Sequence, residues 1–306
     1  MSDEPKEAEN PTGAESQGSK QNGTENVQVR TGADAGDGRP ELVIGIGASA
    51  GGFQPMTALL EQLPSDAGIA VFVIQHRDPS HAGSLTQLLA ARTSLTVLDA
   101  TDGLPIQGNH VYVVPPRGGI SFENGRSWLA DPSEEGALPR PIDAVLNGLA
   151  DEYGERAVGI VLSGTGRDGV RGVRAIRAGG GLTMAQEPAE AEQPAMPAAA
   201  VQSGAVDLVL PADKMGARLE ELVNLTGERP LPEQAPDAER LKEVLEILQT
   251  RIGHDFTGYR KKTLIRRIER RMRLFGLETL PQYVEHLRRG PDEAGELFSD
   301  MLIGVT

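Results

Sequence analysis

Two patterns of hydrophobic residues alternate along the chain. Short, nearly continuous aliphatic runs end at glycine or polar residues, as strands buried on both faces of a parallel sheet do. Between them, apolar residues recur every three or four positions, which predicts helices. The predicted strands are 42–47, 69–76, 95–100, 110–116, 157–164 and 182–186, and the predicted helices are 53–63, 84–94, 141–154, 170–180 and 213–227.

This alternation predicts an α/β fold with a doubly wound, mostly parallel, Rossmann-like sheet and right-handed crossovers. Segments 196–204 and 206–211 finish the sheet region. Aromatic residues are scarce at 4%, and the 37 glycines often follow strand-like runs. Tight strand-to-helix turns explain this composition better than a β-sandwich does.

Changes in composition divide the chain into four parts. Residues 1–39 are polar with almost no large apolar side chains, so we expect a disordered acidic leader. The α/β domain covers 40–227, and the proline- and charge-rich segment 228–240 is typical of a linker. Residues 241–306 predict a small all-α domain.

Charge and composition exclude several functions. The formal net charge of −14 argues against a nucleic-acid binder. There is no cysteine, which rules out disulfides and thiolate chemistry. No signal peptide and no apolar run of about 18 residues is present, so we expect a cytoplasmic protein without membrane insertion.

Ser49, His76 and Asp168 each follow a different predicted strand. Loops at the carboxyl ends of strands in an open α/β sheet converge on one crevice, where a serine, a histidine and an aspartate could form a nucleophile, base and orienter. Each residue alone has a simpler explanation as a turn residue, a satisfied polar residue or a helix cap. Their equivalent positions favour a shared site.

The first glycine turn, GIGASAGG, has a second interpretation. Gly45, Gly47 and Ala50 fit the G-x-G-x-x-[GA] pattern that binds dinucleotide phosphates. That pattern needs an acidic residue at the end of the second strand, where this chain has His76. The Ala50 N–H at a helix start could instead stabilise an oxyanion.

The second glycine loop, SGTGRDG (163–169), would turn tightly beside the first and present Asp168 inward. We therefore expect Ala50, Gly51, Thr165 and Gly166 to support the turn and the oxyanion. The five histidines show no zinc-ligand spacing, so we expect no metal site.

With these residues assembled, 42–225 resembles the catalytic domain of the chemotaxis protein-glutamate methylesterase family (CheB). Six blocks carry the resemblance in order: IGASAGG, QHRDPSHAGSL, VYVVPPRG, RPIDAVLNGLA, LSGTGRDG and GGGLTMAQEP continuing to AMPAAAVQSGAVDLVLP.

The resemblance implies that Ser49 is the nucleophile, His76 the general base and acid, and Asp168 its orienter. It implies hydrolysis of glutamyl methyl esters on the cytoplasmic helices of chemoreceptors or a related sensory protein, with glutamine deamidation in some members. No cofactor is implied for the esterase. This chain departs from the family at Ala50, commonly threonine, and at Thr165, often methionine. Members often carry a phospho-receiver domain in front, where we expect only the disordered leader.

From about residue 240 onward, the chain resembles the helical N-terminal domain of the chemotaxis receptor methyltransferase (CheR). In that family an S-adenosylmethionine domain follows, and here the chain stops at MLIGVT. We therefore expect a portion of an esterase–transferase fusion, with S-adenosylmethionine relevant only if the transferase domain is present in the parent protein.

The predicted helix from about 259 to 275 carries eight Lys or Arg residues against one acid. A basic face of this kind is commonly solvated surface; the resemblance favours docking to an acidic receptor bundle. The tentative docking residues are Arg260, Lys261, Arg266, Arg267 and Arg270, and the apolar stripe expected in the core is Leu264, Ile265, Ile268, Met272 and Phe275.

Two functions from other classes stay open at this point. The glycine pattern leaves a dinucleotide-binding oxidoreductase possible. An esterase fold kept as a non-catalytic signalling scaffold is the other. The oligomeric state does not follow from the sequence.

Overall fold

The computed structural model describes residues 38–76, 85–116, 119–129, 140–227, 238–254, 256 and 259–302. The predicted leader up to residue 37 and the predicted linker from 228 to 237 lie outside these residues, as does the segment 77–84.

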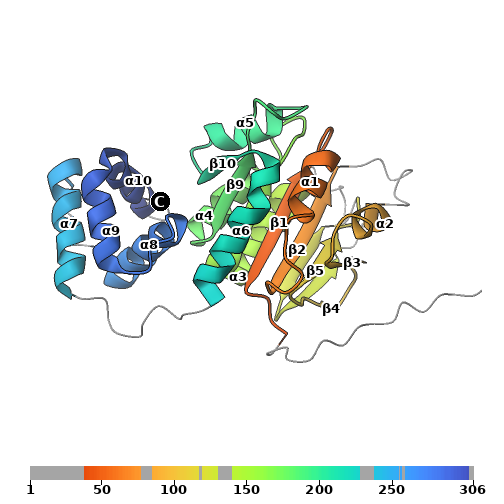
Figure 1. Ribbon diagram of the computed structural model, residues 1–306, viewed down its shortest axis with the longest axis horizontal. Coiled ribbons are helices and arrows are strands. Elements are labelled where there is room, and N and C mark those ends of the chain that lie inside the picture. The colour runs from red at the N-terminus through yellow and green to blue at the C-terminus, as the bar shows by residue number, and fades with distance from the viewer. Residues whose placement is uncertain are drawn as a thin grey trace, which may run out of the picture. The chain divides into compact units, whose positions relative to one another are not determined.

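Seven parallel strands form the main sheet in the order β10-β9-β8-β1-β2-β5-β3 (Figure 1). The predicted α/β fold is confirmed. The strands are β1 (Leu42–Ala48), β2 (Ile69–Gln75), β3 (Thr96–Asp99), β5 (His110–Val113), β8 (Ala157–Val161), β9 (Leu182–Gln186) and β10 (Leu208–Leu210).

The strand order reverses between β1 and β8. β1 pairs with β2 on one side and with β8, which comes much later in the chain, on the other. Helices that follow these strands therefore depart to opposite faces, which opens a crevice at the carboxyl ends of β1 and β8.

Helices cover both faces of the sheet. One buried cluster joins α1, α2 and α6 to the sheet, and a second joins α3, α4 and α5 to the opposite face. In Figure 1, α1 and α6 stand side by side against the sheet. The helices are α1 (Phe53–Leu60), α2 (Leu85–Ala90), α3 (Pro141–Tyr153), α4 (Val170–Ala178), α5 (Ala195–Gln202) and α6 (Ala212–Gly227), with a 3-10 turn η2 (Gly154–Arg156) after α3.

Glycines within β1 let α3 lie directly against it. A Cβ on Gly45 would lie 2.5 Å from Leu146 Cδ2, and one on Gly47 would lie 2.3 Å from Ile142 Cγ2. Both distances are far shorter than a van der Waals contact, so only glycine permits this approach. The N-terminus of α3, which starts at Pro141 as its preference for a first helical position predicts, is thereby held beside the crevice.

A small antiparallel sheet was not predicted. It has the order β4-β7-β6, formed by β4 (Leu104–Pro105), β6 (Ile120–Glu123) and β7 (Arg126–Leu129). Strands of two to four residues are too short for periodicity to be read from sequence. Phe122 holds this sheet against the main one, with its ring 4.9 Å from that of Phe72.

In the described residues from 238 onward, four helices share a buried cluster of their own and make up the helical domain that the sequence predicts. They are α7 (Ala238–Ile252), α8 (Lys261–Leu274), α9 (Leu280–Arg289) and α10 (Pro291–Leu302). The structure starts α7 three residues before the predicted boundary at 241. Thr279 and Gln282 form a capping box at the start of α9.

The apolar stripe of α8 is only partly in this core. Leu264, Ile268 and Met272 are buried there and Ile265 packs against it, as predicted. Phe275 is 40% exposed, so its prediction as core is wrong. Its ring lies 4.1 Å from that of His286, while Leu274 is buried in the cluster of the α/β domain instead. The helix meets two partners, which a single periodic stripe does not reveal.

Across the described parts of the chain, every helix is too short or too polar to cross a bilayer.

The close approach of α3 to β1 gives a first prediction. Gly47→Ala should lower the free energy of unfolding by about 1–3 kcal/mol, because the added methyl overlaps Ile142. Gly295→Ala is the control, since a Cβ there meets nothing within 4 Å inside α10, and it should leave stability unchanged or slightly raised. Urea unfolding of both variants measures this; an unaltered Gly47→Ala midpoint would contradict the packing.

Candidate active site

The structure brings the turns after three strands together at the carboxyl edge of the sheet. Ser49 follows β1, His76 follows β2 and Asp168 lies in the loop after β8. The His76 amide donates to Ala48 O at 3.0 Å, and the Ser49 amide donates to Ser163 O at 3.0 Å. All three predicted residues therefore follow strands of one parallel sheet and lie at its carboxyl edge.

His76 and Asp168 are directly hydrogen-bonded. The distance between His76 Nε2 and Asp168 Oδ2 is 2.8 Å, with the His76 side chain 32% exposed and that of Asp168 6% exposed. An ionised carboxylate only accepts hydrogen bonds, so the neutral imidazole carries its proton on Nε2. Nδ1 is then the basic nitrogen, which is the reverse of the assignment in the chymotrypsin triad.

The carboxylate of Asp168 is held by backbone amides as well as by His76. Oδ1 accepts from the amides of Asp143 at 2.9 Å and Gly169 at 2.9 Å, and Oδ2 accepts from that of Ile142 at 3.0 Å. Two of these amides belong to the first turn of α3, where free N–H groups favour an anion. Asp168 thus accepts hydrogen bonds from the N-terminus of α3 as well as from the Gly169 amide that precedes α4.

These contacts lower the pKa of Asp168. Burial alone would raise the pKa, but the hydrogen bonds from His76 and from the amides of Asp143 and Ile142 outweigh burial and hold it below the ordinary carboxyl value. Asp168 is therefore a carboxylate at neutral pH.

Ser49 sits in a tight turn between β1 and α1. The Gly52 amide donates to Ser49 O at 3.0 Å, and Gly51 has φ +71°, in the left-handed region that favours glycine. Ser49 is 9% exposed, at the surface end of a fully buried strand. The turn fixes its backbone while α1 begins three residues after Ala50.

Ser163 brackets this turn from the neighbouring strand end. Its carbonyl accepts from the Ser49 amide, and its hydroxyl donates to Ala50 O at 2.9 Å. The same hydroxyl accepts from the Gln193 amide at 3.0 Å, and Gln186 Oε1 accepts from the Ser163 amide at 2.8 Å. One fully buried serine therefore fixes the backbone on both sides of the Ser49 side chain.

Gly164 leaves room for Ser49. A Cβ at Gly164 would lie 2.7 Å from Ser49 Cβ and 2.2 Å from Met196 Sδ. Gly164 also exchanges backbone hydrogen bonds with Gln193 and Met196, at 2.9 and 3.0 Å. The second glycine loop thus lies against the serine turn, as the sequence predicted.

The residues predicted to support the turn lie in the turn itself and in the glycine loop after β8. Ala50, Thr165 and Gly166 are exposed and Gly51 is half-buried, and Gly166 has φ +89°. Sequence reasoning missed Ser163, Gln186 and the Gln193–Met196 segment. Ser163 stands at the edge of the glycine loop, but its bond to the turn joins residues 113 positions apart, which no local pattern reports.

The glycine pattern does not form a phosphate cradle. Gly45 and Gly47 lie inside β1 and their open faces are filled by α3, whereas a dinucleotide fingerprint places its glycines in the turn. At the end of the second strand, where the ribose would need an acid, His76 is engaged with Asp168. The dinucleotide interpretation thereby loses the features that suggested it.

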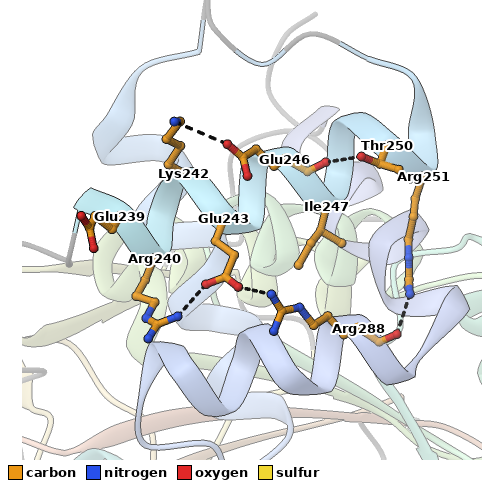
Figure 2. Close-up of a pocket in the computed structure, with 9 residues that line it drawn as sticks. All are labelled: Glu239, Arg240, Lys242, Glu243, Glu246, Ile247, Thr250, Arg251 and Arg288. Atoms are coloured by element: carbon orange, nitrogen blue, oxygen red, sulfur yellow. Dashed lines mark hydrogen bonds and ion pairs between the residues drawn. The ribbon is translucent and has the colours of Figure 1, made fainter.

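An open hollow of about 650 Å³ lies along α7, away from these residues (Figure 2). Its charged side chains pair with each other: Glu243 binds Arg240 and Arg288, and Lys242 lies 3.6 Å from Glu246. A balanced, solvated charge network of this kind contributes little binding energy and suggests no ligand.

The predicted docking residues on α8 separate into two groups. Arg260 and Lys261 are exposed, and Arg266 is half-exposed with its Nε 3.6 Å from Glu155 Oε1. Arg267 and Arg270 are 2% and 0% exposed. The expectation of an accessible face fails for these two, because their guanidinium groups are hydrogen-bonded to the α/β domain.

Comparison with known proteins places both domains in families. The family model described as CheB methylesterase matches residues 44–219, which is more than half of the chain. The model described as the all-alpha domain of CheR methyltransferase matches residues 239–302.

Individual proteins agree with this match. A relative named protein-glutamate methylesterase/protein-glutamine glutaminase 2, from Anaeromyxobacter dehalogenans, is 35% identical over 63% of this chain and 56% of its own length. An uncharacterized 104.1 kDa protein of Rhodobacter capsulatus is 35% identical over 72% of this chain and 26% of its own length. This chain thus spans about a quarter to a little over half of these curated relatives.

A solved structure shares the fold. The crystal structure of the Thermotoga maritima CheB methylesterase catalytic domain matches 59% of this chain and 98% of that domain, with 29% identity and a TM-score of 0.54. The chain therefore belongs to the CheB methylesterase family.

Proposed function

We propose that the chain is a serine hydrolase that removes methyl esters from glutamyl side chains of methylated chemoreceptor helices or a related sensory protein. The observation that carries this proposal is the 2.8 Å bond between His76 and Asp168 at the strand ends that also hold Ser49. The names of the relatives supply the substrate class.

In the first step, His76 Nδ1 takes the proton of Ser49 as its Oγ attacks the ester carbonyl. Asp168 keeps the proton on Nε2 and offsets the imidazolium charge. Collapse of the tetrahedral intermediate breaks the ester C–O bond, and the imidazolium returns its proton to the leaving methoxide. An acyl-Ser49 and methanol result.

The oxyanion needs N–H donors near Ser49. The Ser49 and Gly52 amides are already engaged, by Ser163 O and Ser49 O, so Ala50 and Gly51 are the remaining amides of the turn. We assign the oxyanion to them, with the Thr165–Gly166 turn closing the other side. Ala50 O is anchored by Ser163, which fixes the plane of the following peptide.

Water completes the cycle. His76 takes a proton from water as it attacks the acyl carbon, and returns that proton to Ser49 Oγ, releasing the glutamyl carboxylate. We extend the proposal to glutaminyl side chains, because ammonia can leave by the same route and the relatives' names include a glutaminase.

The proposed substrate places the enzyme in the cytoplasm, where receptor signalling helices lie. The esterase steps use only Ser49, His76, Asp168 and backbone amides, so we propose that they need no cofactor. S-adenosylmethionine would be relevant only to a methyltransferase domain in a longer parent protein. A non-catalytic scaffold is the competing function, and covalent labelling of Ser49 by an organophosphonate distinguishes the two.

Ser49→Ala should lower methanol release from methylated receptor fragments by more than about 10⁴-fold, because no other side chain supplies the attacking oxygen. Its unfolding midpoint should stay close to that of the wild type. The control is Ser203→Ala, whose hydroxyl donates to Ala200 O and accepts from the Ala205 amide, both beside the end of α5. Methanol release by Ser49→Ala at the wild-type rate would contradict the proposal.

Ser163→Ala should lower kcat about ten- to a hundredfold with a smaller change in KM, because loss of the bonds to Ala50 O and from Gln193 N frees the turn around the nucleophile. Ser163→Thr keeps the hydroxyl and should recover most of the rate. Steady-state kinetics on a small methyl ester measures both; equal kcat in all three proteins would remove the positioning role.

Asp168→Asn should lower kcat by about 10³–10⁴-fold, because an amide carries no charge to offset the imidazolium and its NH2 group, turned toward Nε2, selects the wrong tautomer of His76. The variant should also change the pH dependence of stability. A carboxyl whose folded pKa is lowered stabilises the fold above its ordinary pKa of about 3.9, and this contribution is lost as pH falls through the folded value.

Wild-type stability should therefore decrease more steeply than that of Asp168→Asn below about pH 4. Denaturant unfolding between pH 2 and 6 tests this. Parallel curves for the two proteins would show that the carboxylate is not stabilised in the folded state.

A further inference from the structure

One side of α8 carries arginines that contact the α/β domain, two of them buried and two partly exposed. This arginine face comprises Arg266, Arg267, Arg270 and Arg273. Arginine is rarely buried unless its donors are matched. The partners of these side chains therefore identify what the face recognises.

Two of the arginines bind backbone carbonyls, Arg267 at the end of α4 and Arg270 in the loop before β9. Arg267 donates to Arg177 O at 3.1 Å and to Ala178 O at 3.0 Å. Arg270 Nε donates to Gly181 O at 2.9 Å. The last carbonyls of a helix lack internal partners and carry partial negative charge, so cations are favoured there. Arg267 caps α4 from another domain.

Two buried ion pairs also cross between the domains. Arg177 on α4 donates to Asp300 on α10, with Nε 2.7 Å from Oδ1, and Arg270 on α8 binds Asp207, which precedes β10. Arg270 NH1 also reaches Asp300 Oδ2 at 2.6 Å. Each of these four side chains is at most 3% exposed. Two arginines and two aspartates thus alternate in one continuous chain of ion pairs, from Arg177 through Asp300 and Arg270 to Asp207.

Apolar burial surrounds the polar network. Leu274, at the end of α8, is 5% exposed and belongs to the buried cluster that contains Leu219 and Leu222 of α6. Arg218 of α6 donates to Leu274 O. The contact therefore combines a buried charged centre with an apolar margin, the reverse of the apolar core and polar rim of most interfaces.

All of the contacted backbone lies at the amino-terminal edge of the sheet. The loop around Gly180 precedes β9, Asp207 precedes β10 and Glu155 precedes β8. The strands are parallel, so this edge is opposite to the carboxyl edge that holds Ser49 and Asp168. Docking here leaves the serine site uncovered.

We propose that the arginine face of α8 is a docking surface for the chain's own α/β domain, which it fixes at the edge of the sheet remote from Ser49. The face that a receptor-docking role would require is thereby occupied within the chain. Arg260, Lys261 and Lys262 at the start of α8 stay exposed and are the residues that a separate acidic partner can reach.

Cleavage of the folded chain tests the docking directly. A site-specific protease sequence inserted between residues 227 and 238 lets the two domains separate after folding. We expect the halves of the wild type to co-elute in size-exclusion chromatography. Arg270→Ala should raise their dissociation constant at least about thirtyfold, because it leaves Asp207 and Asp300 buried without their cation. Lys261→Ala, exposed on the same helix, is the control and should not change it.

A charge exchange at the margin covers the case in which Arg270→Ala does not fold. Glu155 and Arg266 are both partly exposed and their charges lie 3.6 Å apart. Glu155→Arg and Arg266→Glu should each weaken association several-fold, and the double variant should bind more tightly than Glu155→Arg alone. The proposal would be overturned if the wild-type halves separate at micromolar concentration. It would also be overturned if the double variant binds no more tightly than Glu155→Arg alone.

Methyl ester hydrolysis by the cleaved proteins is the second readout. Glu155→Arg should leave the rate within about twofold of the wild type, since the docked domain does not cover Ser49. A several-fold rise in the hydrolysis rate on undocking would show that the docked domain covers Ser49. It would not contradict the association of the two domains. Co-elution does not depend on esterase activity, so an inactive wild type would count against the proposed function and not against the docking.

Discussion

The carboxylate of Asp168 is the group on which the site's geometry depends. It accepts from His76 and from the first amides of α3, so one anion fixes the base and satisfies a helix end. The arrangement requires α3 to begin beside the crevice. Gly45 and Gly47 make that possible by letting the helix lie on β1 without intervening side chains. The two glycines of β1 thus help to determine where the carboxylate of Asp168 is held.

Ser163 provides the corresponding support for Ser49, the proposed nucleophile. Its carbonyl and hydroxyl hold the peptides on both sides of the Ser49 side chain, and Gly164 beside it leaves space for that side chain. Ser49, His76 and Asp168 therefore stand on strand ends whose spacing is set by the ladder, with a second layer of buried bonds behind them. Such support keeps reacting groups in place and limits reorganisation during the reaction.

The charged residues of the helical domain attach it to the α/β domain, whereas those of the α/β domain form the candidate active site. Burying four charged side chains is costly, and the cost is offset only where every guanidinium finds carboxylates or carbonyls. The network between Arg177, Asp300, Arg270 and Asp207 meets that condition to a large extent. It is specific in geometry, because a guanidinium presents its donors in a fixed plane. Arg267 and Arg270 suggest a receptor-binding surface in the sequence, but in the fold they contact the α/β domain.

The sequence by itself determined the α/β class, the main strands and helices within a few residues, and the residues that reach the crevice. Continuous apolar runs, helical periodicity and glycine turns are local signals, and parallel strands place their ends at a common edge whatever their order. Tertiary structure alone decided the small antiparallel sheet, the role of Ser163, the exposure of Phe275 and the burial of Arg267 and Arg270. Each of these depends on contacts between residues far apart in the chain. A helix with two packing partners has two buried faces, and only the assembled domains show which charged residues the second face contains.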